Sequence, residues 1–166
     1  MRTRSPHELW LVIVDASAST RRHHALSDAK GLLAQLFDDA YRQRARLALL
    51  TASGHTPTWQ VQGLKASAQL RQWLADLGAG GGTPLLAALD QARQWLSVRR
   101  KRLPAEQQRL LLVTDGRVRE WAGLPALDCP GLLIDIERGP IRLGRAKQLA
   151  AELGADYQHI DQLTRG

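Results

Sequence analysis

Residues 9–19 have the sequence LWLVIVDASAS, which places an unbroken apolar run directly before Asp15 and two serines. A short, continuous apolar run is typical of a parallel strand that is buried on both faces of its sheet. Alternate side chains of an extended or looping backbone point to the same side, so Asp15, Ser17 and Ser19 can face one spot. The segment therefore predicts a buried strand that delivers one carboxylate and two hydroxyls to its carboxyl end.

Strand and helix patterns alternate along the rest of the chain. Continuous or alternating apolar runs predict strands at 9–15, 46–51, 58–62, 109–115, 131–137 and 156–160. Apolar residues at helical spacing, with capping signals, predict helices at 25–41, 67–77, 83–98 and 143–153. The short connection before 58–62 favours an antiparallel hairpin and hence an edge strand. This alternation predicts an α/β fold with a mostly parallel sheet covered by helices on both faces.

Length and composition limit the classes of protein to consider. The 166 residues suit a single domain, expected to span 1–166 with its core at about 9–163. A hydrophobic fraction of 44% excludes wholesale disorder, and the one cysteine, Cys129, excludes a disulfide framework and a cysteine-based metal site. No apolar run approaches the ~20 residues of a membrane-spanning helix, and the N-terminus lacks the pattern of a signal peptide. The expected location is the cytoplasm.

The positive charge invites the hypothesis of an acidic partner. The formal net charge is +7, and the densest basic run is 99–102 at the end of a predicted helix. Cations are favourable at that end of a helix dipole, so a solvated helix end is the favoured interpretation. A protein-docking edge and a nucleic-acid patch remain as alternatives. Aromatic residues make up 5% of the chain and do not interleave with the basic ones, as stacking platforms would.

Two further segments add oxygen atoms to those of the first loop. A glycine-rich loop at 78–82 precedes Thr83, which is expected to cap a helix that has Pro84 at its first position. The third predicted parallel strand ends in Thr114 and Asp115. Ligands of open parallel sheets bind outside the carboxyl ends of the strands, where the strand order reverses. All of these donors are oxygens, which suits a hard cation such as Mg²⁺.

The charges of this donor set indicate what the ion would do. Two carboxylates and three neutral hydroxyls barely neutralise a divalent cation, and a water-mediated Asp115 would leave one carboxylate in direct contact. Such an ion attracts an anionic ligand from outside. The donor set therefore favours a site that grips the carboxylate of another molecule over a site that stores metal.

These motifs resemble a known family. Asp-x-Ser-x-Ser with a distant Thr and a distant Asp resembles the metal-ion-dependent adhesion site of von Willebrand factor A domains, also called integrin I-like domains. The finer pattern is similar to the C-terminal domain of the magnesium chelatase D subunit and its cobaltochelatase relatives. It consists of Gly80-Gly81-Gly82-Thr83-Pro84-Leu85, Leu112-Val113-Thr114-Asp115-Gly116-Arg117 and Leu149-Ala150-x-x-Leu153-Gly154-Ala155-x-Tyr157. Where the family usually has Gly and Met around the last serine, this chain has Ala18 and Thr20.

The resemblance implies a doubly wound, six-stranded sheet in the order 3-2-1-4-5-6. It implies that Asp15, Ser17, Ser19 and Thr83 hold Mg²⁺, or Mn²⁺ or Ca²⁺ in its place, with Asp115 close in or acting through water. It also implies a non-catalytic adaptor that presents the metal to an acidic residue of a partner. In the chelatase family this partner system is an AAA+ ATPase assembly. That assembly works with a large subunit that inserts Mg²⁺ or Co²⁺ into a tetrapyrrole, as in cobalamin synthesis.

Other functions stay open beside the adaptor. A basic nucleic-acid-binding accessory protein with a structural metal site is the main alternative, and it rests on the net charge. A metal-dependent hydrolase would need a nucleophile and base, which the sequence does not supply. The glycine-rich loop lacks the spacing of a nucleotide site. The histidines are expected at the surface or in loops, namely His23, His24, His55 and His159.

Basic residues flank two of the three predicted metal loops and predict a positively charged rim. Arg21 and Arg22 follow the first loop, Arg117 and Arg119 follow the third, and Trp121 is the best candidate for an exposed aromatic contact. A rim of this kind would steer an acidic surface, and salt would screen the attraction. Solvent-facing arginines that only improve solubility are the alternative.

We expect the affinity for an acidic protein partner to fall as ionic strength rises, and to fall further in Arg117→Glu, because both changes weaken attraction across the rim. Binding measured over a salt series, for the wild type and the variant, checks this prediction. A complex that responds neither to salt nor to the substitution would contradict it.

Overall fold

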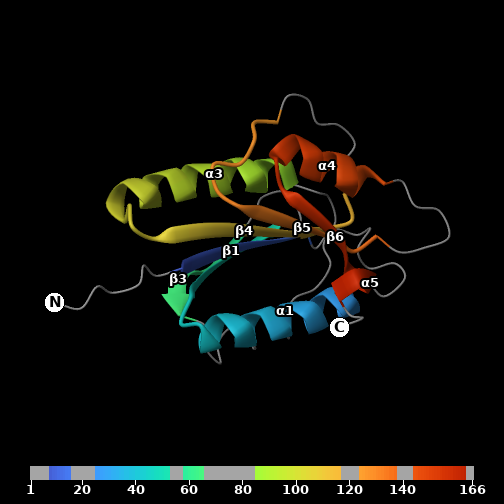
Figure 1. The fold of residues 1–166 in the computed structure, drawn as a ribbon, viewed down its shortest axis with the longest axis horizontal. Helices are drawn as coiled ribbons and strands as arrows, with labels where there is room; N and C mark the ends of the chain where they lie inside the picture. The colour runs from blue at the N-terminus through green and yellow to red at the C-terminus, as the bar shows by residue number, and fades with distance from the viewer. Residues whose placement is uncertain are drawn as a thin grey trace.

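A computed structural model describes residues 8–15, 25–52, 58–65, 85–116, 124–137 and 144–163. Six strands form one sheet between helices (Figure 1). The strands are β1 (Glu8–Asp15), β2 (Arg46–Ala52), β3 (Thr58–Lys65), β4 (Gln107–Thr114), β5 (Gly131–Asp135) and β6 (Asp156–His159). The helices are α1 (Ala25–Arg42), α3 (Leu85–Arg102), α4 (Arg145–Leu153) and α5 (Ile160–Leu163). The helix predicted at 67–77 and the glycine-rich loop at 78–82 lie outside the described residues.

The strand order confirms the predicted topology. The sheet runs β3-β2-β1-β4-β5-β6, with every pair parallel except β2 and β3, which are antiparallel. The antiparallel β3 therefore forms the predicted edge. The chain proceeds from β1 to β2 in one direction and from β4 to β5 in the other. The strand order thus reverses between β1 and β4, which places the expected ligand-binding point at their carboxyl ends.

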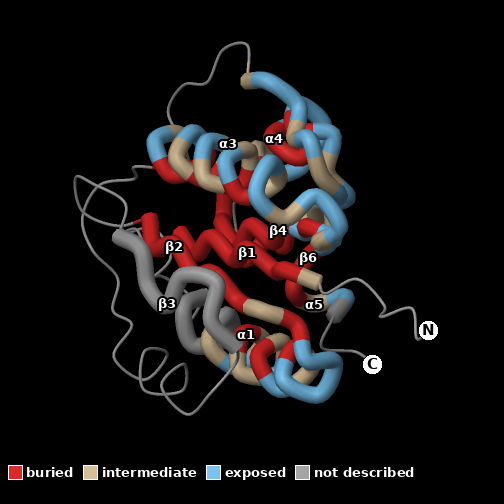
Figure 2. Tube along the Cα trace, turned by 90° about the vertical axis from the view of Figure 1, so that its left-hand side faces the viewer, coloured by how far each residue is buried: buried red, intermediate tan, exposed pale blue. Residues whose placement is uncertain are grey.

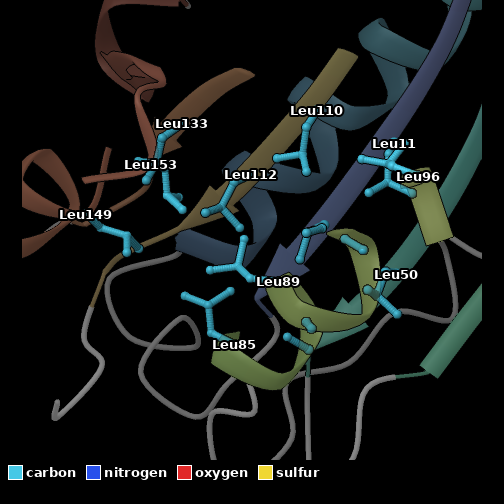
Figure 3. Packing of buried hydrophobic residues seen from close by; sticks show 14 of the residues in the cluster. Leu11, Leu50, Leu85, Leu89, Leu96, Leu110, Leu112, Leu133, Leu149 and Leu153 are labelled. Carbon is cyan, nitrogen blue, oxygen red and sulfur yellow. The ribbon is translucent and has the colours of Figure 1, made fainter. Parts of the chain in front are cut away.

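A leucine-rich cluster joins one face of the sheet to α3 and α4. Side chains from four strands meet those of the two helices in a layer that excludes water (Figure 3). Leu85 and Leu89 come from α3, Leu149 comes from α4, and Leu112 from β4 lies among them (Figure 3). Fully burying a side chain of this size contributes about 1.5–3 kcal/mol, so this layer is a main source of stability.

The opposite face is covered by α1, with α5 as a single turn beside it (Figure 1). Phe37 of α1 and Ile160 of α5 are buried in the same cluster as Val12 and Val14 of β1. The central strands β1, β2 and β4 consequently form a mostly buried layer between helices with exposed outer surfaces (Figure 2). β1 is buried from Leu9 to Asp15, as its apolar sequence predicts. None of the described helices has the length and hydropathy needed to cross a membrane.

The connection from α3 to β4 fixes which end of α3 lies near the expected site. α3 ends at Arg102, and β4 begins at Gln107 after a tight turn in which the Glu106 N–H donates to the Leu103 carbonyl at 3.1 Å. The end of α3 therefore lies at the amino edge of the sheet. Because α3 runs back along the strands, its beginning at Leu85 lies at the carboxyl edge (Figure 1).

Several element ends differ from the predicted ones. β3 continues to Lys65 instead of ending at 62, and α3 continues to Arg102 instead of 98. β5 ends at Asp135, two residues before the predicted end, although the Ile136 N–H still donates to the Thr114 carbonyl at 3.0 Å. The last predicted strand gives way at Ile160 to the one-turn helix α5.

The basic run at the end of α3 is not a purely solvated helix end. Arg99 is 6% exposed, and its Nε and Nη2 donate to Glu106 Oε1 and Oε2 at 2.5 and 2.9 Å. Its guanidinium also lies 5.3 Å from the centre of the Trp95 ring, within the range of a cation–π contact. The interpretation of 99–102 as solvated is therefore wrong for Arg99, which stabilises the turn into β4.

We expect Glu106→Ala to lower the free energy of unfolding by about 3–5 kcal/mol, because it leaves the buried Arg99 charge without its carboxylate. Lys101→Ala, at an exposed position of the same helix end, should change it by less than about 0.5 kcal/mol. Urea unfolding of the two variants checks the difference. Equal effects would show that the Arg99 pair contributes no more than a surface charge.

Candidate metal centre

The apolar strand β1 ends in a buried carboxylate. Asp15 is the last residue of β1 and is fully buried. A buried carboxylate is costly unless it accepts hydrogen bonds. The Thr114 hydroxyl, from the end of the neighbouring strand β4, donates to Asp15 Oδ2 at 2.7 Å. The Asp15 carboxylate is therefore oriented from across the point where the strand order reverses.

The residues after β4 extend this arrangement. The Thr114 hydroxyl also accepts a hydrogen bond from the Gly116 N–H at 3.0 Å, so one hydroxyl links Asp15 to the turn after β4. Asp115, inside that turn, is 3% exposed. Gly116 has φ +72°, and a Cβ at this position would lie 2.4 Å from the backbone nitrogen of Ala146 in α4. Glycine is therefore required here both for its backbone conformation and for the close packing of α4.

The structure brings together the two predicted metal ligands that it describes. Asp15 and Asp115 lie at the carboxyl ends of the adjacent strands β1 and β4, and α3 begins with Leu85 at the same edge. The other predicted site residues lie outside the described residues. These are Ser17, Ser19 and Thr83 among the ligands, and Arg21, Arg22, Arg117, Arg119 and Trp121 in the rim.

The chemistry of this edge fits a hard divalent cation. Two buried carboxylates at neighbouring strand ends supply anionic oxygen donors, the kind that Mg²⁺, Mn²⁺ and Ca²⁺ prefer. Among the described ranges, no group of three or more His, Cys, Asp or Glu side chains is arranged to hold an ion. Asp15 and Asp115 thus need further donors, and the predicted hydroxyls of Ser17, Ser19 and Thr83 are of the right type.

A second polar cluster, which the sequence analysis missed, lies at the carboxyl ends of β5 and β6. Asp135 Oδ2 accepts a hydrogen bond from the Tyr157 hydroxyl at 2.5 Å, and its Oδ1 accepts one from the Glu137 N–H at 2.8 Å. His159 Nε2 lies 2.8 Å from the Glu137 carbonyl oxygen. Asp135 and Glu137 are two residues apart, as are Tyr157 and His159. That shared spacing places alternate strand side chains on one face and is the signal that could have found them.

The expectation that His159 is a surface or loop histidine is wrong. Its side chain is buried, and Nδ1 accepts a hydrogen bond from the Asp161 N–H at 3.1 Å. A nitrogen that accepts carries no proton in the neutral ring, so we assign the proton to Nε2, which donates to the Glu137 carbonyl. The α5 turn supplies the backbone donor, and β6 alone could not have indicated it. His23, His24 and His55 lie outside the described residues.

Burial raises the pKa of two titrating groups among the described residues. It raises the pKa of the Asp135 carboxyl, and Glu137 adds to this effect, while the hydrogen bonds from Tyr157 and the Glu137 N–H and the nearby His159 act in the opposite direction. Burial also raises the pKa of the Cys129 thiol, opposed by Arg100 and reinforced by Asp128. Cys129 is partly buried and held as the thiol, which is the weakly nucleophilic form.

Comparison with known proteins identifies the family. The family described as von Willebrand factor type A domain matches residues 10–117, which include both carboxylates of the candidate centre. The chain belongs to this family. The match agrees with the doubly wound sheet and with the two aspartates at its switch point.

Relatives of this von Willebrand factor A domain include larger proteins. An uncharacterized protein of Mycobacterium tuberculosis is 30% identical over 93% of this chain, which spans 26% of that protein. The magnesium-chelatase 67 kDa subunit of Chlorobaculum tepidum is 30% identical over 92% of this chain, which spans 28% of that subunit. This domain is thus related to magnesium-chelatase subunits and spans about a quarter of the length of these two relatives.

A solved structure agrees with the fold. The manganese-loaded TRAP protein of Plasmodium vivax superposes with a TM-score of 0.70 at 18% identity, covering 97% of this chain and 71% of that one. At that identity the likeness concerns the arrangement of strands and helices. It confirms the von Willebrand factor A fold.

We expect wild-type stability to fall, relative to Asp135→Asn, as pH rises from about 4 toward neutrality. Burial raises the folded-state pKa of Asp135, so the folded state holds the proton more tightly than the unfolded state and is penalised as the proton leaves. The asparagine does not titrate, and its amide oxygen can still accept the Glu137 N–H. Urea unfolding of both proteins across this range checks the sign. A difference that stays flat, or that grows in favour of the wild type, would contradict it.

Proposed function

We propose that this domain is a Mg²⁺-dependent protein-binding adaptor that presents a metal ion to an acidic residue of a partner. The partner is an AAA+ ATPase of a chelatase-type complex that inserts Mg²⁺ or Co²⁺ into a tetrapyrrole, and a large chelatase subunit belongs to the same complex. Asp15, Ser17, Ser19 and Thr83 hold the ion, with Asp115 close in or acting through water. Mn²⁺ or Ca²⁺ would substitute for Mg²⁺.

One observation carries this proposal. The Thr114 hydroxyl donates to the fully buried Asp15, and the buried Asp115 follows Thr114 directly, at the carboxyl ends of the two central strands. A carboxylate held in place before an ion binds loses less conformational freedom on binding. Two buried carboxylates at one edge supply anionic oxygen donors of the kind that a hard divalent cation prefers, which supports a metal ion there.

The relatives support the identity of the partner. Several proteins similar to this chain are named magnesium-chelatase subunits, and two of them come from Chlorobaculum tepidum and Rhodobacter capsulatus. The similarity to the Chlorobaculum tepidum subunit extends over 92% of this chain, well beyond the metal motif. Similarity of that extent supports a shared docking surface as well as a shared fold.

Each part of the edge has a defined task in this adaptor. When bound, the metal supplies a Lewis-acidic position for a carboxylate oxygen of the partner. Thr114 sets the direction of the Asp15 carboxylate, and the Gly116 N–H sets the direction of Thr114. With Asp115 acting through water, Asp15 is the one carboxylate in direct contact and the ion keeps a net positive charge. The arginine rim adds to the attraction for an acidic surface. Binding and orientation are the whole task, and no bond of a substrate is broken.

The basic run at 99–102 gives limited support to the nucleic-acid alternative. Arg99 is paired with Glu106, and Arg100 Nη2 donates to Gln108 Oε1 at 3.4 Å. These two arginines serve the turn between α3 and β4, which reduces the charge they can offer to phosphates. Nucleic acid remains an outcome of the test below.

We expect the domain to retain its ATPase or chelatase partner from a native lysate in Mg²⁺ and to lose it in EDTA. Asp15→Asn should lose the partner as well, because the asparagine amide lacks the negative charge of the carboxylate. Its oxygen can still accept the hydrogen bond from Thr114. Asp156→Ala, an exposed acidic position at the amino edge of β6, is the matched control and should bind as the wild type does. Mass spectrometry of the retained proteins is the measurement.

Two other outcomes would contradict the proposal. Retention that is unchanged by EDTA and by Asp15→Asn would mean that the edge plays no part in partner binding. Retention of nucleic acid without metal, with a steep dependence on salt, would favour the basic accessory protein.

A further inference from the structure

The cluster of Asp135, Glu137, Tyr157 and His159 holds one residue at both of its backbone groups. The Glu137 N–H donates to Asp135 Oδ1 at 2.8 Å, and the Glu137 carbonyl accepts from His159 Nε2 at 2.8 Å. Tyr157 and Asp161 in turn hold the two side chains that make these contacts. Four hydrogen bonds from β5, β6 and α5 thus fix the position of Glu137.

The Glu137 side chain uses this fixed position to reach the start of α4. Its carboxylate is buried, and Oε1 accepts the Gly144 N–H at 3.2 Å, seven residues further along the chain. Gly144 immediately precedes α4 and provides no side-chain cap of its own. An acceptor with negative charge is favourable at the beginning of a helix, where the backbone N–H groups lack partners. Glu137 therefore anchors the first turn of α4.

The first turn of α4 lies directly against the candidate metal centre. The Ala146 backbone approaches Gly116 so closely that no side chain fits between them. The Gly116 N–H donates to Thr114, and Thr114 donates to Asp15. A continuous series of contacts therefore runs from Glu137 through Gly144 and Ala146 to the turn that orients Asp15.

We propose that Glu137 is a positioning residue of the metal centre. By holding Gly144, it keeps the first turn of α4 against Gly116 and thereby keeps Thr114 in the position from which it orients Asp15. The effect on metal binding rests on the proposed function, whereas the effect on Gly116 does not. Substitution of a residue that orients metal ligands without touching the ion typically lowers metal affinity by roughly 10–100-fold.

The experiment compares Glu137→Ala, Glu137→Gln and Gln108→Ala. Glu137→Ala removes the acceptor for Gly144, and Glu137→Gln keeps an oxygen in its place. Gln108 is a buried side chain at the amino end of β4 whose Nε2 donates to the Leu96 carbonyl at 3.1 Å. Gln108→Ala therefore removes a buried hydrogen bond at the amino end of β4, the strand whose carboxyl end carries Thr114. This makes it the control for a general loss of stability.

The first readout is amide hydrogen exchange by NMR without metal. We expect the Gly116 amide and the first turn of α4 to exchange faster in Glu137→Ala. Exchange should return close to the wild-type rate in Glu137→Gln, while the amides of β1 stay protected in both. Unchanged exchange at Gly116 in Glu137→Ala would overturn the inference, and so would an equal acceleration there in Gln108→Ala.

The second readout is the affinity for Mn²⁺, measured by EPR titration of the free ion. Glu137→Ala should bind about 10-fold more weakly than the wild type, and Glu137→Gln should recover most of the loss. Wild-type affinity in Glu137→Ala would overturn the link to the metal centre. A wild-type chain that binds no Mn²⁺ would refute the proposed function, and the exchange data would then decide by themselves whether Glu137 positions Gly116.

Discussion

The hydrogen bond from the Thr114 hydroxyl to the Asp15 carboxylate joins the two central strands at the point where the strand order reverses. Every neighbouring feature depends on it. β1 can remain apolar along its length and still end in a buried acid, because β4 supplies a partner for that acid. The same hydroxyl accepts from Gly116, whose backbone admits α4 at close range. The core leucines fix the strands relative to the helices, and this bond orients the carboxylate at the end of β1.

Much of the fold could be predicted because the signals are local and periodic. The apolar run that ends in Asp15 predicts a buried parallel strand, and the alternation of elements predicts the helical layers on both faces. The strand order required the family resemblance, since spacing alone does not order a sheet. The errors at Arg99 and His159 have one cause. Each side chain is held by partners outside its own helix or strand, Glu106 for Arg99, and the Glu137 carbonyl and the α5 turn for His159. Periodicity carries no information about such partners.

Two groups of buried polar residues lie at the carboxyl ends of the parallel strands. Asp15 and Asp115 are buried at the carboxyl ends of β1 and β4, where we propose the metal centre. Asp135 and the residues bonded to it lie one and two strands further along, where they are bonded to one another and brace the backbone. Burial is common to both groups, so burial does not distinguish a ligand site from a brace. In the second group, the side chains of Asp135 and His159 hold the two backbone groups of Glu137.

The short β6 has a consequence for how copies of this fold can associate. An exposed sheet edge offers unpaired backbone groups on which another strand can assemble, and long, flat edges are the usual start of aggregation. β6 has four residues, and Asp156 and Gln158 are exposed along it. An incoming strand would gain few backbone bonds there and would meet a charge. Copies of this domain can therefore lie close together with little tendency to associate through this edge.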